Sequence, residues 1–121
     1  DKLEENISLI KSKNVKAGIA INPDTPINNL TDIITRLDLV CLMGVFPGFA
    51  GQKFIRNTFD RLKELKKLII DNNSKALIEV DGGVKADNYM ELRSLGADVL
   101  VAGSYIFNSK DYKEVIKKLK E

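Results

Sequence analysis

The chain has 121 residues, of which 44% are hydrophobic and 30% charged, and its net charge is +2. This length suffices for one small domain with a core, and the charge balance argues against a nucleic-acid-binding protein. No apolar stretch is long enough to span a membrane, and no secretory signal is visible. The single cysteine, Cys41, excludes an intrachain disulfide and predicts a reducing, cytoplasmic compartment.

The first predicted elements are a helix, a strand and a second, shorter helix. Apolar residues follow helical spacing over residues 3–10, and residues 15–22 have the apolar composition of a strand. Thr25 and Pro26 predict the start of the short helix, as a capping hydroxyl followed by a proline in the first turn. The apolar face of this helix falls within residues 30–34.

The later elements continue the alternation of strands and helices. They are a strand over 37–45, a glycine-rich loop over 47–54, a helix over 59–69, a strand over 76–81, a helix over 89–95, a strand over 98–104, a short turn over 105–109 and a helix over 112–119. Gly96 follows the predicted helix over 89–95, where a left-handed cap is expected. The lysine runs in ELKKLI and IKKLKE are interpreted as solvated helix faces.

This order predicts an α/β fold with a helix followed by four βα units. The short apolar strands are typical of parallel strands that are covered on both faces. Two architectures fit: a small open doubly wound sheet, or half of a (β/α)8 TIM barrel, which normally takes about 250 residues. The length and the start at Asp1, without a methionine, favour the half barrel. We therefore expect parallel strands in sequential order, each followed by a helix on one outer layer.

The position of each acidic residue relative to the strands suggests its role. Asp38 and Asp98 precede apolar strands and are expected at the stabilising end of the sheet. Asp81 ends the strand 76–81, so we expect it at the functional end, with a catalytic or metal-binding role or, alternatively, a turn or helix-capping role. Glu79 shares a strand face with Asp81, either as its partner or as part of a buried polar cluster.

Glycines follow the last three predicted strands and suggest a phosphate site. The relevant residues are Gly48, Gly51, Gly82, Gly83, Gly103 and Ser104. Backbone N–H groups without side chains can approach a phosphate closely, and the turn over 105–109 would add a favourable dipole. The alternative is a set of ordinary βα turns. If Gly83 serves the anion, replacing it with valine is expected to weaken binding with little change in fold.

Three further residues remain open between two roles. Met43 ends a predicted strand, where its side chain either lies beside a reacting carbon or fills the core. Asn22 ends the first predicted strand, where its side chain either contacts the substrate or forms a side-chain turn with the backbone. Phe49 covers a ligand or packs inward.

Four motifs together resemble the ribulose-phosphate 3-epimerase family and its close relative, allulose-6-phosphate 3-epimerase. They are AINPDTP, PGFAGQKF, IEVDGGV and GADVLVAGSYIF, in this order. The resemblance covers nearly the whole chain but only the C-terminal half of the family's barrel. It implies that residues 1–121 form the C-terminal half of a single TIM-barrel domain whose N-terminal half is absent from this chain.

The resemblance implies an enzyme that inverts C3 of a ketose phosphate, converting D-ribulose 5-phosphate to D-xylulose 5-phosphate in the pentose phosphate pathway. Two aspartates transfer the proton on opposite faces, assisted by one divalent metal ion (Zn, Fe, Mn or Co). Asp81 is implied as one of the pair and as a metal ligand. The implied substrate and phosphate contacts are Gly48, Phe49, Ala50, Gly51, Gly82, Gly83, Gly103 and Ser104. The other aspartate and two histidine ligands belong to the N-terminal half, so this chain alone is expected to be inactive.

Two residues depart from the family pattern. Gly44 stands where a small hydroxyl residue is usual, and Phe46 stands where a polar residue is usual. The alternatives kept open are allulose-6-phosphate 3-epimerase, another phosphate-binding barrel enzyme such as a lyase or isomerase, and a non-catalytic phosphate-binding half-barrel. The expected partner is a small-molecule sugar phosphate, with no nucleic acid and no membrane, and homo-oligomerisation stays open.

Overall fold

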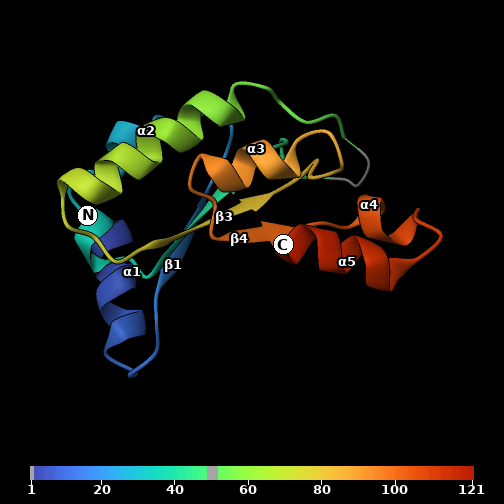
Figure 1. The fold of residues 1–121 in the computed structure, drawn as a ribbon. Helices are drawn as coiled ribbons and strands as arrows, with labels where there is room; N and C mark the ends of the chain where they lie inside the picture. Colours follow the sequence, from blue (N-terminus) through green and yellow to red (C-terminus); the bar gives the residue numbers. More distant parts are fainter. Residues whose placement is uncertain (1, 49–51) are drawn as a thin grey trace.

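The computed structural model describes residues 2–48 and 52–121 and contains one parallel sheet. Its strands are β1 (Gly18–Ile21), β2 (Leu39–Met43), β3 (Leu77–Asp81) and β4 (Val99–Val101), in the order β1-β2-β3-β4. In a doubly wound sheet, the order of the strands would reverse at a switch point. The sequential order therefore confirms the predicted arrangement of half a (β/α)8 barrel (Figure 1).

Helices and 3₁₀ turns connect these strands. They are α1 (Lys2–Lys11), η1 (Ile27–Leu30), η2 (Ile34–Arg36), α2 (Thr58–Asp71), α3 (Tyr89–Ser94), α4 (Ser104–Phe107) and α5 (Tyr112–Lys120). In Figure 1, α2 and α3 lie on the same side of the sheet, and α4 and α5 lie beyond β4. The core lies on the side of α2 and α3, where Val40, Leu42, Ile78 and Val80 are fully buried.

The other face of the sheet carries the alternate residues of each strand. Within the described residues this face has little cover, and Leu77 and Val101 are 47% and 38% exposed. Cys41 pairs in register with Glu79 on β3, and Met43 pairs with Asp81. This is the face that would line the interior of a closed barrel.

The prediction of a short helix after β1 is wrong about the type of helix. The structure has two 3₁₀ turns, η1 and η2, and Pro26, not Thr25, occupies the N-cap position. The segment between residues 27 and 36 is rich in Asn, Thr and Ile, which are weak helix formers. The Thr31 hydroxyl also donates to the carbonyl of Asn28 at 2.8 Å and so competes with backbone N–H groups for this acceptor. The apolar residues predicted to face the core are nonetheless buried.

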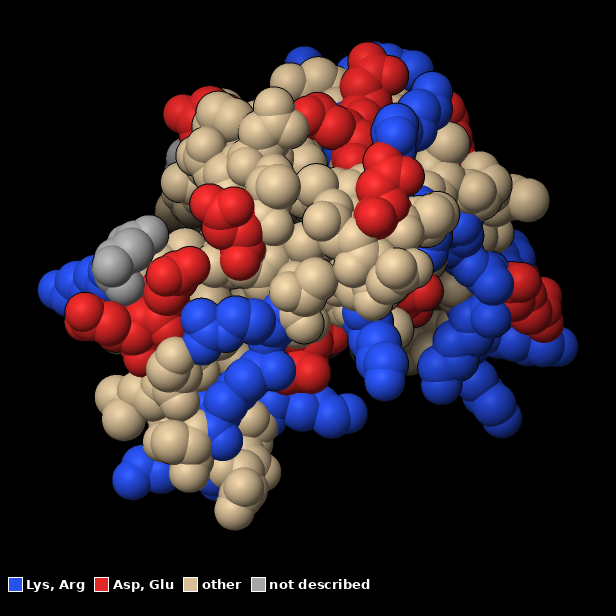
Figure 2. All heavy atoms as spheres, turned by 90° about the vertical axis from the view of Figure 1, so that its left-hand side faces the viewer, with Lys and Arg blue, Asp and Glu red and all other residues tan. Residues whose placement is uncertain are grey.

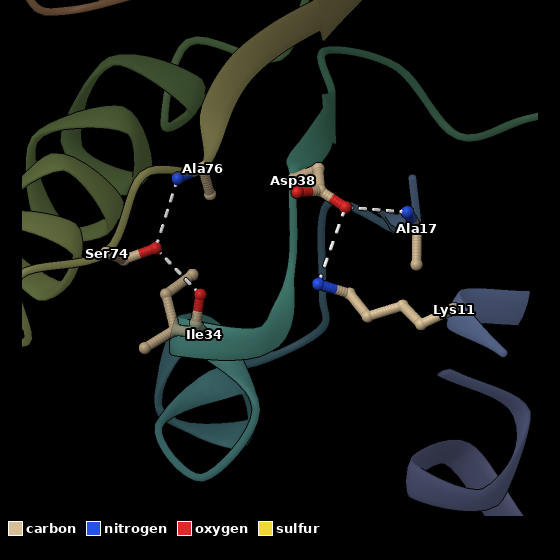
Figure 3. Close-up of polar contacts among 6 residues, drawn as sticks. All are labelled: Lys11, Ala17, Ile34, Asp38, Ser74 and Ala76. Carbon is tan, nitrogen blue, oxygen red and sulfur yellow. Dashed lines mark hydrogen bonds and ion pairs between the residues drawn. The ribbon is translucent and has the colours of Figure 1, made fainter. Parts of the chain in front are cut away.

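Asp38 and Asp98 lie at the amino ends of their strands, as predicted. Asp38 Oδ2 accepts a 2.8 Å hydrogen bond from the N–H of Ala17 and lies 3.6 Å from Lys11 Nζ (Figure 3). The hydrogen bond from Ala17, opposed by desolvation and aided by Lys11, lowers the pKa of Asp38. Asp98 Oδ2 accepts a 2.9 Å bond from the N–H of Ile78 in the same manner. Each carboxylate thereby ties its strand to the preceding one.

The outer helix faces are charged and exposed, which confirms the interpretation of the lysine runs. Lys67 pairs with Asp71, and Lys118 pairs with Glu114, each one helical turn apart. Figure 2 shows basic side chains on the right-hand side and across the lower part of the molecule, with acidic side chains interspersed among them. Such exposed pairs contribute little stability. Among the described residues, no helix combines the length and apolar character needed to cross a bilayer.

Candidate active site

A cavity of about 370 Å³ lies at the carboxyl ends of the strands, where the sequence predicts the site. The predicted site residues that line it are Gly48, Asp81, Gly82, Gly83, Gly103 and Ser104. The other substrate and phosphate contacts that the resemblance implies, Phe49, Ala50 and Gly51, lie outside the described part of the chain. The loops after β2, β3 and β4 therefore converge on one hollow, which also exposes Met43 and Val101. Its volume is in the range of small-molecule sites.

Asp81 lies at one side of this cavity and is partly buried. Burial, and secondarily the charge of Glu79, raise the pKa of Asp81 above its ordinary value. Glu79 lies one step earlier on the same strand face, in register with Cys41. Burial, followed by the hydrogen bond and charge of Glu79, raises the pKa of the Cys41 thiol to about 12. The cysteine is therefore protonated at neutral pH, and Asp81 is the titratable group among the described residues that line the cavity.

The turn after Asp81 requires its two glycines. Gly82 and Gly83 have φ angles of +108° and +72°, which side chains rarely adopt. A Cβ at Gly83 would lie 2.8 Å from Phe54 Cβ and 2.9 Å from Phe54 Cα. The expectation that Gly83→Val leaves the fold almost unchanged is therefore wrong, because the added side chain would meet the backbone of Phe54.

Gly103 is different, since an added Cβ would have no described heavy atom within 4 Å. It precedes α4, the short helical turn that the sequence predicts after the fourth strand. Gly103 lines the cavity, and a Cβ added there meets no described atom, so a side chain at this position should leave the described fold undisturbed.

Gly44, which the sequence presents only as a departure from a family pattern, has a structural role. Its N–H donates to the carbonyl of Asp81 at 2.7 Å, and its carbonyl accepts from Ile55 at 2.8 Å. A Cβ at this position would collide with the carbonyl oxygen of Gly82. The absence of a side chain lets the end of β2 lie directly against the turn after β3.

A second hollow of about 410 Å³ adjoins the first on the outer side. Both are lined by Gln52, Gly83, Val84 and Ser104. The outer hollow is also lined by two cations, Lys53 and Lys85. Sequence reasoning assigned no role to either lysine, although Lys53 lies in the PGFAGQKF motif. Their position gives the outer side of the site a positive charge that suits an anionic group.

Asn22, proposed as a substrate contact or a turn residue, directly follows β1. Its side chain is exposed and is not part of either hollow. Its carbonyl accepts a 3.0 Å bond from Arg61 Nη2, while Arg61 Nη1 donates to the carbonyl of Thr25 at 2.6 Å. Arg61 thus ties α2 to the loop that follows β1.

The donor set of this chain does not fit a complete divalent metal site. The sequence contains no histidine, and the described residues include no group of three or more His, Cys, Asp or Glu side chains placed to hold a metal. Cys41 is buried and does not line the cavity. Asp81 is the carboxylate that this chain could offer to a metal at the cavity.

Comparison with known proteins agrees with this geometry. A family model described as the ribulose-phosphate 3 epimerase family matches residues 1–107. The chain is 47% identical over 119 residues to a ribulose-phosphate 3-epimerase of Buchnera aphidicola subsp. Acyrthosiphon pisum, covering 98% of this chain and 52% of that protein. It is 43% identical over 118 residues to the Escherichia coli protein of the same name, covering 98% and 52%. The chain therefore spans about half the length of the curated relatives it matches.

Proposed function

The chain belongs to the ribulose-phosphate 3-epimerase family, and on this premise we propose that it supplies half of the active site of a ketose-phosphate 3-epimerase. The substrate pair would be D-ribulose 5-phosphate and D-xylulose 5-phosphate, in the pentose phosphate pathway. The observation that carries the proposal is the convergence of a carboxylate, Asp81, and three glycine-bearing loops on one cavity.

Asp81 would remove the proton from C3 on one face of the sugar. The C3–H bond breaks, the proton passes to a carboxylate oxygen, and the bonding electrons shift toward the C2 carbonyl to give an enediolate. A carboxylic acid on the opposite face then returns a proton to C3, which inverts that carbon. The raised pKa of Asp81 makes it a stronger base than an ordinary aspartate, which supports this role.

The phosphate would lie at the other side of the cavity, against Gly82, Gly83, Gly103 and Ser104. The backbone can approach an anion closely at these residues. Lys53 and Lys85, on the adjoining hollow, would add favourable charge. The predicted contacts of Phe49, Ala50 and Gly51 stay part of this proposal.

A second half-barrel would complete the site, with residues 1–121 as the C-terminal half of one TIM-barrel domain. Three features support this proposal: the open edges of β1 and β4 in the described sheet, the exposed face that carries Leu77 and Val101, and the half-length match to the relatives. The second half would bring the opposing carboxylate and the other ligands of a divalent metal, with Asp81 as this chain's contribution. The chain alone would then be inactive. A cytoplasmic location and the sugar phosphate as partner belong to the same proposal.

A chimera tests this function. This chain would replace the matching segment of the Escherichia coli relative, with which it aligns over 118 residues. We expect the folded chimera to interconvert D-ribulose 5-phosphate and D-xylulose 5-phosphate. Preference for D-allulose 6-phosphate would assign the other epimerase activity. Binding of the sugar phosphate without conversion would instead favour a non-catalytic half-barrel.

A further inference from the structure

Asn88 has a side chain whose hydrogen bonds are both directed at the turn after β3. It is only 4% exposed. Its Nδ2 donates to the carbonyl of Gly83 at 2.8 Å, and its Oδ1 accepts from the N–H of Lys85 at 2.9 Å. The buried amide of Asn88 therefore bridges Gly83 and Lys85. Gly83 is one of the glycines proposed to contact the phosphate.

The location of Asn88 at the start of a helix would suggest a different use. It occupies the N-cap position of α3, where an asparagine side chain usually accepts a bond from the first turn. In the described structure, Asn88 makes no such capping bond to α3. Its amide instead serves residues 83–85, whose backbone is not part of any regular element.

The bond to Gly83 fixes the orientation of the peptide that follows. In a trans peptide, the C=O and the next N–H point in opposite directions. Because the Gly83 carbonyl points to the buried amide of Asn88, the N–H of Val84 points away from Asn88. Val84 lines both hollows, so this N–H is a candidate donor to an anion bound there.

The bond to Lys85 acts on the next residue of the same turn. Holding the Lys85 N–H fixes where the side chain leaves the backbone, on the rim of the outer hollow. The Lys85 ammonium group has only a distant ion pair with Asp87, at 4.0 Å, and its side chain is 55% exposed. The cation can therefore reach an anion in this hollow.

We propose that Asn88 is a positioning residue for the phosphate group, acting through the Gly83–Val84 peptide and Lys85. This inference rests on the proposed sugar-phosphate function and adds to it a residue and a backbone donor, the Val84 N–H. Asn88 itself does not line either hollow. Its effect would be on the affinity for the phosphate group and not on the chemistry at C3.

The test measures the binding of inorganic phosphate and D-ribulose 5-phosphate to the 121-residue chain by calorimetry, and follows the Val84 amide by ¹⁵N–¹H NMR. Asn88→Ala removes both side-chain bonds. Asn88→Ser keeps a short hydroxyl and is the second variant, in case the alanine variant does not fold. Asn72→Ala is the matched control, since Asn72 Nδ2 donates to the Leu68 carbonyl at 2.8 Å at the far end of α2.

We expect both Asn88 variants to bind the two phosphate ligands more weakly, by on the order of tenfold, the upper scale of one lost hydrogen bond. Phosphate should shift the Val84 amide resonance in the parent and not in the variants. Asn72→Ala should bind phosphate as the parent does. In the chimera, Asn88→Ala should raise KM and leave kcat nearly unchanged.

Three results would overturn the inference. In one, folded Asn88 variants bind phosphate as tightly as the parent. In another, Asn72→Ala weakens binding as much as Asn88→Ala, which would reduce Asn88 to a general structural role. In the last, the folded parent binds no phosphate. That result would also refute the phosphate side of the proposed function, whereas the first two results would leave the proposed function standing.

Discussion

The N–H of Gly44 donates to the carbonyl of Asp81 at 2.7 Å, which joins the ends of two neighbouring strands at the cavity. The residue that bears the proposed catalytic carboxylate is therefore fixed through its backbone by the end of β2. The bond depends on a close approach that a side chain at residue 44 would prevent, since its Cβ would collide with the carbonyl of Gly82.

Gly44→Ser should consequently destabilise the chain, although serine resembles the residue usual at this place in the family. Overpacking of this kind costs about 1–3 kcal/mol of unfolding free energy. Urea unfolding followed by circular dichroism would measure it. An unchanged midpoint would show that the turn after β3 can move away from residue 44 without cost.

Gly83 and Gly103 should respond differently to the same substitution. Gly83→Val should destabilise the fold, because φ is +72° and the backbone of Phe54 blocks the side chain. Gly103→Val should change the unfolding free energy by no more than about 0.5 kcal/mol, as at an unconstrained surface position. It should nevertheless weaken phosphate binding, because its side chain would enter the cavity. Calorimetric titration with phosphate checks this, and undiminished affinity would place the anion elsewhere.

Asp38 should make the stability of the chain depend on pH. Its pKa is lowered in the folded state, mainly by the hydrogen bond from Ala17, so folding favours the carboxylate. This contribution is present above the unfolded pKa of aspartate, about 3.9, and is lost as the pH falls through the lower folded value. Asp38→Asn should therefore be less stable than the parent at pH 7, with a difference that shrinks toward pH 3. A difference that is constant over this range would contradict the assignment.

Arg61 should be needed to hold the loop after β1. Its guanidinium group donates to the carbonyls of Asn22 and Thr25, from partly buried surroundings. Arg61→Met keeps the apolar part of the side chain but leaves both carbonyls without this donor, at a cost of about 1–3 kcal/mol. Amide hydrogen exchange should become faster in residues 22–31 and stay unchanged near Asp98. Unchanged exchange rates in residues 22–31 of the variant would indicate that the loop is held by other contacts.

The sequence predicted the sheet well because its signals are local and regular. The apolar runs that became β2 and β3 are short, and the acids before β2 and β4 fall at the strand starts. The segment after β1 was predicted less well, because its apolar spacing does not distinguish an α-helix from two 3₁₀ turns. Burial of its apolar residues was predictable, whereas the hydrogen-bond pattern was not.

For the candidate site, sequence reasoning identified the residues that motifs contain and missed those that act through distant contacts. Asp81 and the glycines lie at strand ends, where topology alone brings them together. The contact of Phe54 with Gly83 joins residues 29 positions apart, so the poor tolerance of Gly83 for valine could not be read from its own neighbours. Asn88 has the sequence signature of a helix cap, and only its two side-chain bonds reveal its attachment to residues 83–85.

The proton-transfer role of Asp81 is the central claim, and Asp81→Asn in the chimera tests it most directly. Asparagine is nearly isosteric but cannot take up a proton, so packing and phosphate binding should largely survive. We predict that conversion of D-ribulose 5-phosphate to D-xylulose 5-phosphate falls by at least about a hundredfold, the scale of a lost acid–base group. Exchange of the C3 hydrogen with deuterated solvent should persist from one epimer at most. Interconversion of the two epimers at the parent's rate would contradict the account and leave Asp81 as a turn residue.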